Sequence, residues 1–216
     1  EIVSIDGTRA YFLTSGTSTR LAVIYHGNAS TACSNASLAR LFLLRGWNVL
    51  SVEYAGYSGD TEHTPSVALL RKDVDHIDRW VKAEPYTEVL IVGRSVGSGF
   101  ASYHVSLAPP AFPYALLLVS PFDSLLEVAR GQFPMYPVRF MMRDNLDNVA
   151  SGGSASRVLI IHGTRDVIVP FERGKSLFEK LPQKNKTFYS AEGYEHNDVL
   201  DSHEVWQVID DFLQLR

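Results

Sequence analysis

Residues 87–99 read TEVLIVGRSVGSG. Within its first half, residues 89–92 form an uninterrupted apolar run rich in β-branched residues, which is typical of a strand covered on both faces. The pentapeptide 93–97, GRSVG, follows directly as a G-x-S-x-G sequence, and a helix-like run with small residues comes next. The two glycines permit a tight turn and close packing of the helix on the strand. Ser95 is therefore predicted to stand clear of a sheet at a strand–turn–helix junction.

Similar apolar runs recur along the chain and alternate with stretches of helical periodicity. Strands are predicted at 9–14, 21–26, 47–54, 87–92, 114–120, 157–162 and 186–190. Helices are predicted at 33–45, 66–83, 95–108, 171–181 and 200–214. This alternation favours a single α/β domain over residues 1–216, with a mostly parallel sheet and helices on both faces. Residues 125–156 are the exception, and their prolines and paired glycines predict a small insertion.

Composition narrows the classes of function. The 216 residues, 45% hydrophobic and 20% charged, suit one globular domain. The net charge of −4 lacks the basic excess expected of a nucleic-acid-binding protein. Cys33 is the single cysteine, which excludes an internal disulfide and a cysteine-based metal site. No apolar run reaches the length of a membrane span. A soluble, cytoplasmic protein is expected, with membrane contact only through a segment preceding residue 1.

A serine hydroxyl needs an adjacent base to act as a nucleophile at neutral pH. Cys33 is the weaker candidate nucleophile, because it is expected to be a small residue at a helix start. His196 lies in a loop after the last predicted strand and before the last helix, where the base belongs in a triad ordered Ser, acid, His. The other histidines fall in predicted helices, in a polar loop or at strand ends, where local packing or bonding is expected: His76, His104, His203, His63, His26 and His162.

The acid of such a triad should lie between the serine and the histidine, at the carboxyl end of a strand. Asp166 follows the predicted strand 157–162 and would hold the imidazole tautomer and stabilise the imidazolium. Asp123, after the preceding strand, is the alternative, and Asp144 and Asp147 within the insertion are less well placed.

A tetrahedral intermediate also needs donors for its oxyanion. The backbone N–H of Val96 would lie at the positive end of the helix after Ser95. The second donor is expected from the loop after strand 21–26, at the N–H of Asn28 with Ala29 as the alternative. The other interpretation of this loop is an ordinary glycine turn.

The insertion carries a group of large apolar side chains that could line an acyl-chain groove beside Ser95. Phe133, Met135, Phe140 and Met141 are the expected substrate-binding residues, and methionine adapts well to irregular apolar shapes. The alternative is that these side chains pack the insertion onto the sheet.

Together these stretches resemble the alpha/beta-hydrolase superfamily over nearly the whole chain. The matching segments are YHGNAS, EYAGYSGD, GRSVGSG, SPFDSL, YPVRFMMRDNLDN, HGTRDVIVP and GYEHND. Their order and spacing look most similar to the compact branch with serine aminopeptidase-like and depalmitoylase-like serine hydrolases. The resemblance implies eight mostly parallel strands, the first pair antiparallel, and hydrolysis of carboxylic esters or thioesters. The sequence departs from the branch's D-Y-R-G-Y-G-x-S loop at Glu53, Ala55 and Ser58.

The expected function is two-step acyl transfer on a small-molecule ester or thioester, through an acyl-enzyme on Ser95 with His196 and Asp166 as its triad partners. This chemistry requires no metal and no organic cofactor. The alternatives are a non-catalytic ligand-binding protein on the same fold, a peptidase, or another chemistry on this scaffold such as that of a lyase or peroxidase.

Overall fold

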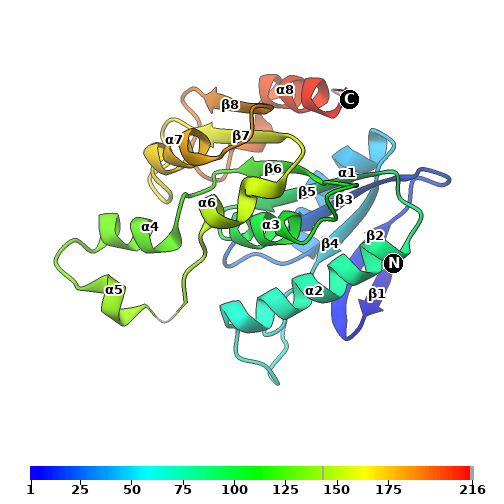
Figure 1. Ribbon diagram of the computed structural model, residues 1–216, viewed down its shortest axis with the longest axis horizontal. Helices are drawn as coiled ribbons and strands as arrows, with labels where there is room; N and C mark the ends of the chain where they lie inside the picture. Colours follow the sequence, from blue (N-terminus) through cyan, green and yellow to red (C-terminus); the bar gives the residue numbers. More distant parts are fainter. Residues whose placement is uncertain (143, 215–216) are drawn as a thin grey trace.

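Eight strands form one sheet through the middle of the molecule (Figure 1). The computed structural model describes residues 1–142 and 144–214. In chain order the strands are β1 (Ile2–Ile5), β2 (Thr8–Leu13), β3 (Arg20–Tyr25), β4 (Asn48–Val52), β5 (Glu88–Arg94), β6 (Ala115–Val119), β7 (Val158–Gly163) and β8 (Lys186–Ala191). Across the sheet they follow the order β1-β2-β4-β3-β5-β6-β7-β8.

The pairing of the strands confirms the predicted fold class. β2 pairs antiparallel with both β1 and β4, and every later pairing is parallel. Strands β3 to β7 are almost entirely buried, because helices cover both faces, which explains why their sequences do not alternate. β1 was not among the strands predicted from the apolar runs, since its four residues are short and mostly exposed. The carboxyl ends of the parallel strands meet at one edge of the sheet.

The helices cover the two faces of the sheet (Figure 1). They are α1 (Ala36–Leu44), α2 (Val67–Ala83), α3 (Gly97–Ser106), α4 (Leu125–Gln132), α5 (Val138–Met141), α6 (Asn148–Ser151), α7 (Phe171–Lys180) and α8 (His203–Gln214). Short 3-10 turns occur at Cys33–Asn35, Gly152–Ser154 and Val199–Asp201. Among the described residues, no helix combines the length and the apolar character needed to cross a bilayer.

Two hydrophobic cores hold the helices to the sheet. On one face, Val74 of α2 and Phe100 of α3 are buried against side chains of the central strands. On the other face, Phe42 of α1 and Ile209 of α8 are buried in the same way. The Ser66 hydroxyl begins α2 by accepting the Leu69 N–H at 3.2 Å. The layers therefore follow from amphipathic helices that bury one face each.

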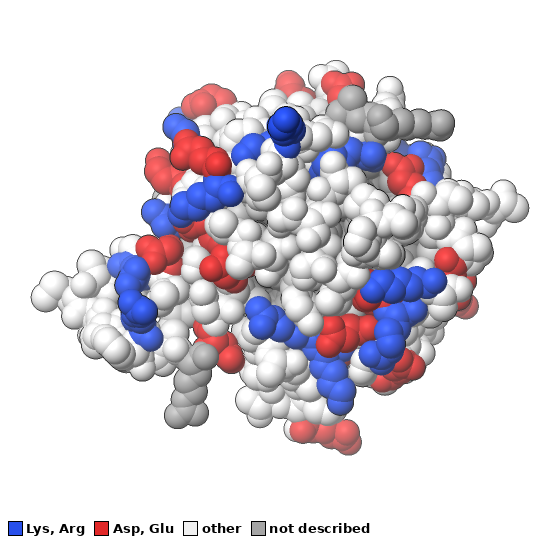
Figure 2. All heavy atoms as spheres, viewed as in Figure 1, with Lys and Arg blue, Asp and Glu red and all other residues white. Residues whose placement is uncertain are grey.

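The insertion is partly helical and is anchored at its base. α4 and α5 project from the body at the left of Figure 1, whereas α6 lies back against it. The Asn148 side chain of α6 donates hydrogen bonds to Ser98 Oγ at 2.9 Å and to the Phe122 carbonyl at 2.8 Å. In Figure 2 charged side chains of both signs are scattered over the body, while the projecting part is mostly uncharged. The insertion is thus fixed at α6 and extends outward at α4 and α5.

Candidate active site

Ser95 occupies a strained turn between β5 and α3. Its φ of 52° lies in the left-handed region, which costs energy for a residue other than glycine and is typical of functional sites. A side chain at Gly97 would place its Cβ 2.5 Å from the His26 carbonyl oxygen, and one at Gly93 would lie 2.6 Å from Ala101 Cβ. Glycine is therefore required on both sides of Ser95. The structure forms the predicted strand–turn–helix junction.

Neighbouring strands bring Asp166 and His196 together. Asp166 follows β7, His196 follows β8, and both side chains are buried. His196 Nδ1 lies 2.7 Å from Asp166 Oδ2. Because an ionised carboxylate only accepts hydrogen bonds, Nδ1 carries the proton and donates it. Nε2 of His196 is then left as the ring nitrogen that can accept a proton.

The Asp166 carboxylate is fully engaged. Its Oδ1 accepts the N–H groups of Ile168 at 2.9 Å and Val169 at 2.8 Å, and His162 Nε2 lies 3.2 Å from Oδ2. Burial by itself raises the pKa of Asp166, but hydrogen bonds from His162, His196 and the Val169 N–H outweigh burial and hold that pKa well below its usual range. Asp166 therefore stays ionised. The sequence predicted local bonding for His162, and the structure has it: Nε2 lies 2.9 Å from the Val169 carbonyl oxygen as well as beside this carboxylate.

Backbone hydrogen bonds tie the loop that carries Asp166 to the loop that carries His196. The N–H of Arg165 donates to the Tyr194 carbonyl at 2.9 Å, and the N–H of Thr164 donates to the Ala191 carbonyl at 3.0 Å. The N–H of Gly193 donates to Thr164 Oγ1 at 2.9 Å. These contacts fix the separation of the acid and the imidazole, so the pair is held by the backbone as well as by its own hydrogen bond.

The loop after β3 runs directly past Ser95. A Cβ built at Gly27 would lie 3.4 Å from Ser95 Cβ, an ordinary contact distance. Ala29 in the same loop has a left-handed φ of 52°. Within the described part of the chain, the N–H groups of Asn28 and Val96 donate no hydrogen bond. The two backbone donors predicted for an oxyanion are therefore uncommitted.

Glu53 holds this loop at both ends. His26 Nε2 lies 3.3 Å from Glu53 Oε1, and Glu53 Oε2 accepts the Ala32 N–H at 3.0 Å. His26 Nδ1 lies 2.9 Å from the Gly27 carbonyl oxygen. Burial raises the pKa of Glu53, but hydrogen bonds from His26, Ser58 and the Ala32 N–H bring it below its usual value. An ionised, buried Glu53 thus braces the loop beside Ser95.

The departures from the family's loop are accommodated locally. Ser58, where the branch usually has glycine, keeps a left-handed φ of 51°. Ala55 replaces an arginine, and its N–H donates to Asp73 Oδ2 at 3.0 Å. The Gly56 N–H donates to Asp60 Oδ2 at 2.8 Å. Two aspartates therefore pin the loop through its backbone.

Asp123, the alternative acid, contacts helix α7 and makes no hydrogen bond with His196 in the described structure. Its Oδ2 accepts hydrogen bonds from Ser176 Oγ at 2.8 Å and Lys180 Nζ at 3.0 Å, both on α7. Burial raises the pKa of Asp123, but these two bonds and the nearby Arg173 hold it below its usual value. Asp147 caps α6 by accepting the Ala150 N–H, a structural task. Asp166 is the acid that the structure brings to His196.

The Asp123→Asn variant is expected to be less stable than the wild type by about 2 kcal/mol at pH 7, since a buried charged hydrogen-bond acceptor is lost. The folded-state pKa is depressed, so the ionised carboxylate stabilises the fold above its unfolded pKa of about 3.9 and loses that effect as pH falls through the folded value. Urea unfolding at pH 7 and pH 3 measures the difference, which should shrink at pH 3. An equal difference at both pH values would contradict this assignment.

Ser95 and His196 open into one cavity of about 470 Å³. Its walls come from the loop after β3, the serine turn and the loops after β7 and β8. The lining residues are Gly27, Asn28, Ala29, Ser30, Ser34, Arg94, Ser95, Ile168, His196 and Asn197. Among these, the Ser95 and His196 side chains make no direct hydrogen bond in the described structure, a common state of catalytic groups before substrate binds.

Other residues singled out in the sequence lie outside this cavity. Phe133, Met135, Phe140 and Met141 are exposed on the insertion and do not line the cavity. Their assignment to an acyl groove stays a prediction. Cys33 is exposed and also lies outside the lining, next to Ser34.

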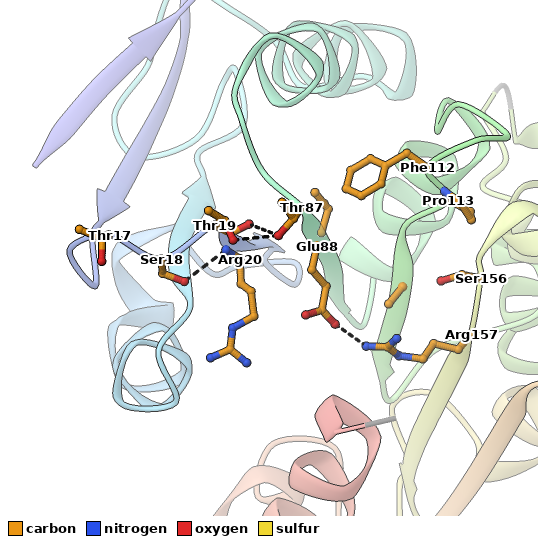
Figure 3. A pocket seen from close by; sticks show the side chains of 12 residues that line it. Thr17, Ser18, Thr19, Arg20, Thr87, Glu88, Phe112, Pro113, Ser156 and Arg157 are labelled. Atoms are coloured by element: carbon orange, nitrogen blue, oxygen red, sulfur yellow. Dashed lines mark hydrogen bonds and ion pairs between the residues drawn. The ribbon is translucent and has the colours of Figure 1, made fainter. Parts of the chain in front are cut away.

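A larger cavity of about 680 Å³ lies at the opposite edge of the sheet, near the amino ends of β3 and β5 (Figure 3). Thr19 and Thr87 hydrogen-bond across it at 2.8 Å, and Glu88 pairs with Arg157 at 2.7 Å. Its lining contains no histidine or cysteine. Elsewhere in residues 1–142 and 144–214, no three His, Cys, Asp or Glu side chains are arranged to hold a metal ion.

Comparison with known proteins agrees with this geometry. A family model described as "Serine aminopeptidase, S33" matches residues 16–129. An uncharacterized protein of Mycobacterium tuberculosis is 31% identical over 206 residues, covering 93% of this chain and 72% of that protein. Lysophosphatidylserine lipase ABHD12 of Danio rerio is 27% identical over 88% of this chain and 56% of its own length. The chain thus spans about half the length of that relative.

A solved structure extends the likeness to the fold. An esterase from Exiguobacterium antarcticum superposes with a TM-score of 0.72 at 18% identity, covering 99% of this chain and 98% of that one. The eight-stranded sheet, the serine turn and the family match agree with one another. The chain belongs to the serine aminopeptidase S33 family of alpha/beta hydrolases.

Proposed function

We propose that this chain is a serine hydrolase that cleaves carboxylic esters or thioesters through an acyl-enzyme on Ser95. One observation carries the proposal. A strained serine and a histidine line the same cavity, and that histidine donates its Nδ1 proton to a buried carboxylate at 2.7 Å. Those are the roles of nucleophile, base and orienting acid in a hydrolytic triad.

In the first half-reaction, His196 Nε2 accepts the Ser95 hydroxyl proton while Oγ attacks the substrate carbonyl carbon. Asp166 stabilises the imidazolium that forms. The negative charge passes to the carbonyl oxygen, where the N–H groups of Asn28 and Val96 would donate, each such donor contributing about 2.7–4 kcal/mol. His196 then gives its proton to the leaving alcohol or thiol as the bond to the acyl carbon breaks.

In the second half-reaction, water replaces the leaving group. His196 Nε2 accepts a proton from water, whose oxygen attacks the acyl carbon bound to Ser95 Oγ. The tetrahedral intermediate collapses, the proton returns to Oγ, and the carboxylic acid leaves. Because Nδ1 stays bonded to Asp166, the imidazole keeps one orientation throughout both halves.

The lining of the cavity favours esters over peptides. An aminopeptidase must hold the α-ammonium group of its substrate, which calls for a carboxylate. The described lining contains no Asp or Glu, and its one fixed cation is Arg94. A relative named as a lysophosphatidylserine lipase also fits a carboxylic ester. We therefore propose that oxygen esters are the preferred substrates, that thioesters are hydrolysed less efficiently, and that peptides are the poorest substrates.

Turnover of matched substrates tests this order. Nitrophenyl esters from acetate to palmitate are expected to be hydrolysed with kcat/KM at least about 100-fold above that of alanine nitroanilide, because an amide needs stronger assistance to its leaving group. A thioester series should fall between them. Equal turnover of the anilide would support a peptidase. No turnover of any substrate would support a non-catalytic binding protein.

A further inference from the structure

The insertion carries an exposed apolar surface that the proposed reaction does not use. Met135 is 91% exposed and Phe140 is 88% exposed. We define the apolar patch as these residues with their exposed neighbours on the insertion and on the loop after β7: Phe133, Met135, Tyr136, Phe140, Met141, Val167 and Ile168. Soluble proteins seldom leave so many large apolar side chains together in water, and such groups mark interaction sites.

The shape of the insertion keeps these side chains outward. α4 and α5 stand away from the body in Figure 1. Pro134 and Pro137 lie between the two helices and prevent one continuous helix from forming there. A hollow of about 500 Å³ lies between them, and Arg130 and Arg139 are among its lining residues. The patch is therefore a raised apolar surface with a hollow that has two arginines in its wall.

The charges that line the hollow are of one sign. Its wall holds Arg130 and Arg139 and no aspartate or glutamate, and the acidic residues of the insertion lie outside that lining: Glu127, Asp144 and Asp147. Arg130 is neutralised by Glu127 at 2.6 Å, whereas Arg139 forms no ion pair with any described residue. Figure 2 shows the projecting segment as mostly uncharged surface with a group of basic side chains on it. A surface that complements the patch would be apolar inside and negatively charged outside.

The patch continues to the active-site cavity. Gln132 at the end of α4 donates its Nε2 hydrogen to the Ile168 carbonyl at 3.0 Å, which ties the insertion to the loop after β7. The Ile168 side chain belongs to the patch and also lines the cavity with Ser95. Whatever covers the patch therefore lies beside the cavity mouth.

We propose that the apolar patch docks on an anionic lipid surface. The aromatic, methionine and aliphatic side chains enter the boundary between headgroups and acyl chains, as exposed apolar faces of interfacial proteins do. Arg139 lies at headgroup level and binds phosphate or carboxylate groups there. Docking places the mouth of the cavity at the lipid surface, where an ester drawn from the lipid reaches Ser95. That last step rests on the proposed function, while docking itself does not.

A second copy of the chain fits the patch less well. In a two-fold contact the same surface faces itself, so Arg139 of each copy would approach the basic surface of the other. An anionic lipid surface instead supplies opposite charge and apolar depth together.

Binding to vesicles tests the proposal without any turnover. Partition of the wild type is measured by co-sedimentation with phosphatidylcholine vesicles and with vesicles that contain about 30% phosphatidylserine, where the arginines should raise affinity severalfold. Met135→Ser with Phe140→Ser is expected to lower partition at least about 10-fold into both vesicle types. Arg139→Gln should lower it about fivefold for the anionic vesicles alone.

Leu44→Ser is the matched control, because Leu44 is 72% exposed on α1, outside the patch. This variant should bind like the wild type, and thermal melting checks that all variants fold. Ser95→Ala should bind vesicles fully, so loss of hydrolysis and loss of docking are distinguishable. The proposal is overturned if the patch variants bind as the wild type does, or if the wild type sediments as a dimer that Met135→Ser with Phe140→Ser makes monomeric.

Discussion

Replacing Ser95 with alanine is expected to lower kcat for ester hydrolysis by about 10⁶-fold, as loss of the triad nucleophile does in known serine hydrolases. The substitution removes the atom proposed to form the acyl-enzyme, while the proposed oxyanion donors and the cavity stay in place. KM should change little. Alanine should not add backbone strain at this left-handed position, because serine already has a Cβ there. Nitrophenyl ester turnover measures the effect.

Ser106→Ala is the control for this substitution, because Ser106 is the last residue of α3, the helix that follows Ser95. Its hydroxyl bonds the Tyr103 carbonyl on the surface, away from the cavity. This variant should keep wild-type kcat. If Ser95→Ala retained more than about one hundredth of the wild-type rate, Ser95 would not be the nucleophile.

Asp166→Asn is expected to lower kcat by about 10⁴-fold with little change in KM. The asparagine amide can turn its NH₂ group toward His196, which then takes the wrong tautomer and carries its proton on Nε2. Oδ1 can still accept the N–H groups of Ile168 and Val169, so the loop should keep its shape. The wrong tautomer cannot accept the Ser95 proton, and the rate falls for that reason.

Asp123→Asn is the matched control, because Asp123 is also a buried aspartate at the end of a parallel strand. It contacts α7 and not the histidine, so the change should cost stability and leave kcat within a few-fold of wild type. The reverse result, a large loss of kcat for Asp123→Asn and a small one for Asp166→Asn, would exchange the roles of the two acids.

The fold was predictable because the local sequence of each central strand is a recognisable apolar run. Runs such as 89–92 and 158–161 are apolar without alternation, and in a parallel sheet their carboxyl ends must share one edge. That rule by itself places the residues after β5, β7 and β8 near one another. The topology therefore predicts that Asp166 and His196 lie close together, and in the structure their side chains are hydrogen-bonded.

Contacts between residues distant in the chain were not predictable in the same way. The second histidine on Asp166 and the bracing of the loop after β3 by Glu53 depend on side-chain directions that no periodicity encodes. The only sequence signal for the contact of His162 with Asp166 was their spacing of four residues. The insertion lacks a regular hydrophobic pattern, so the sequence left two interpretations open for its large apolar side chains: lining an acyl-chain groove or packing onto the sheet. The exposure of these side chains is visible only in the three-dimensional structure.

Covalent trapping tests the central claim most directly. The wild type is incubated with a fluorophosphonate, digested and mapped by tandem mass spectrometry, with Ser30 and Ser34 as the other serines in the same cavity. We predict one adduct, on Ser95, that forms at least about 100-fold more slowly in His196→Ala. An adduct on Ser30 or Ser34, or none on any serine, would contradict the account.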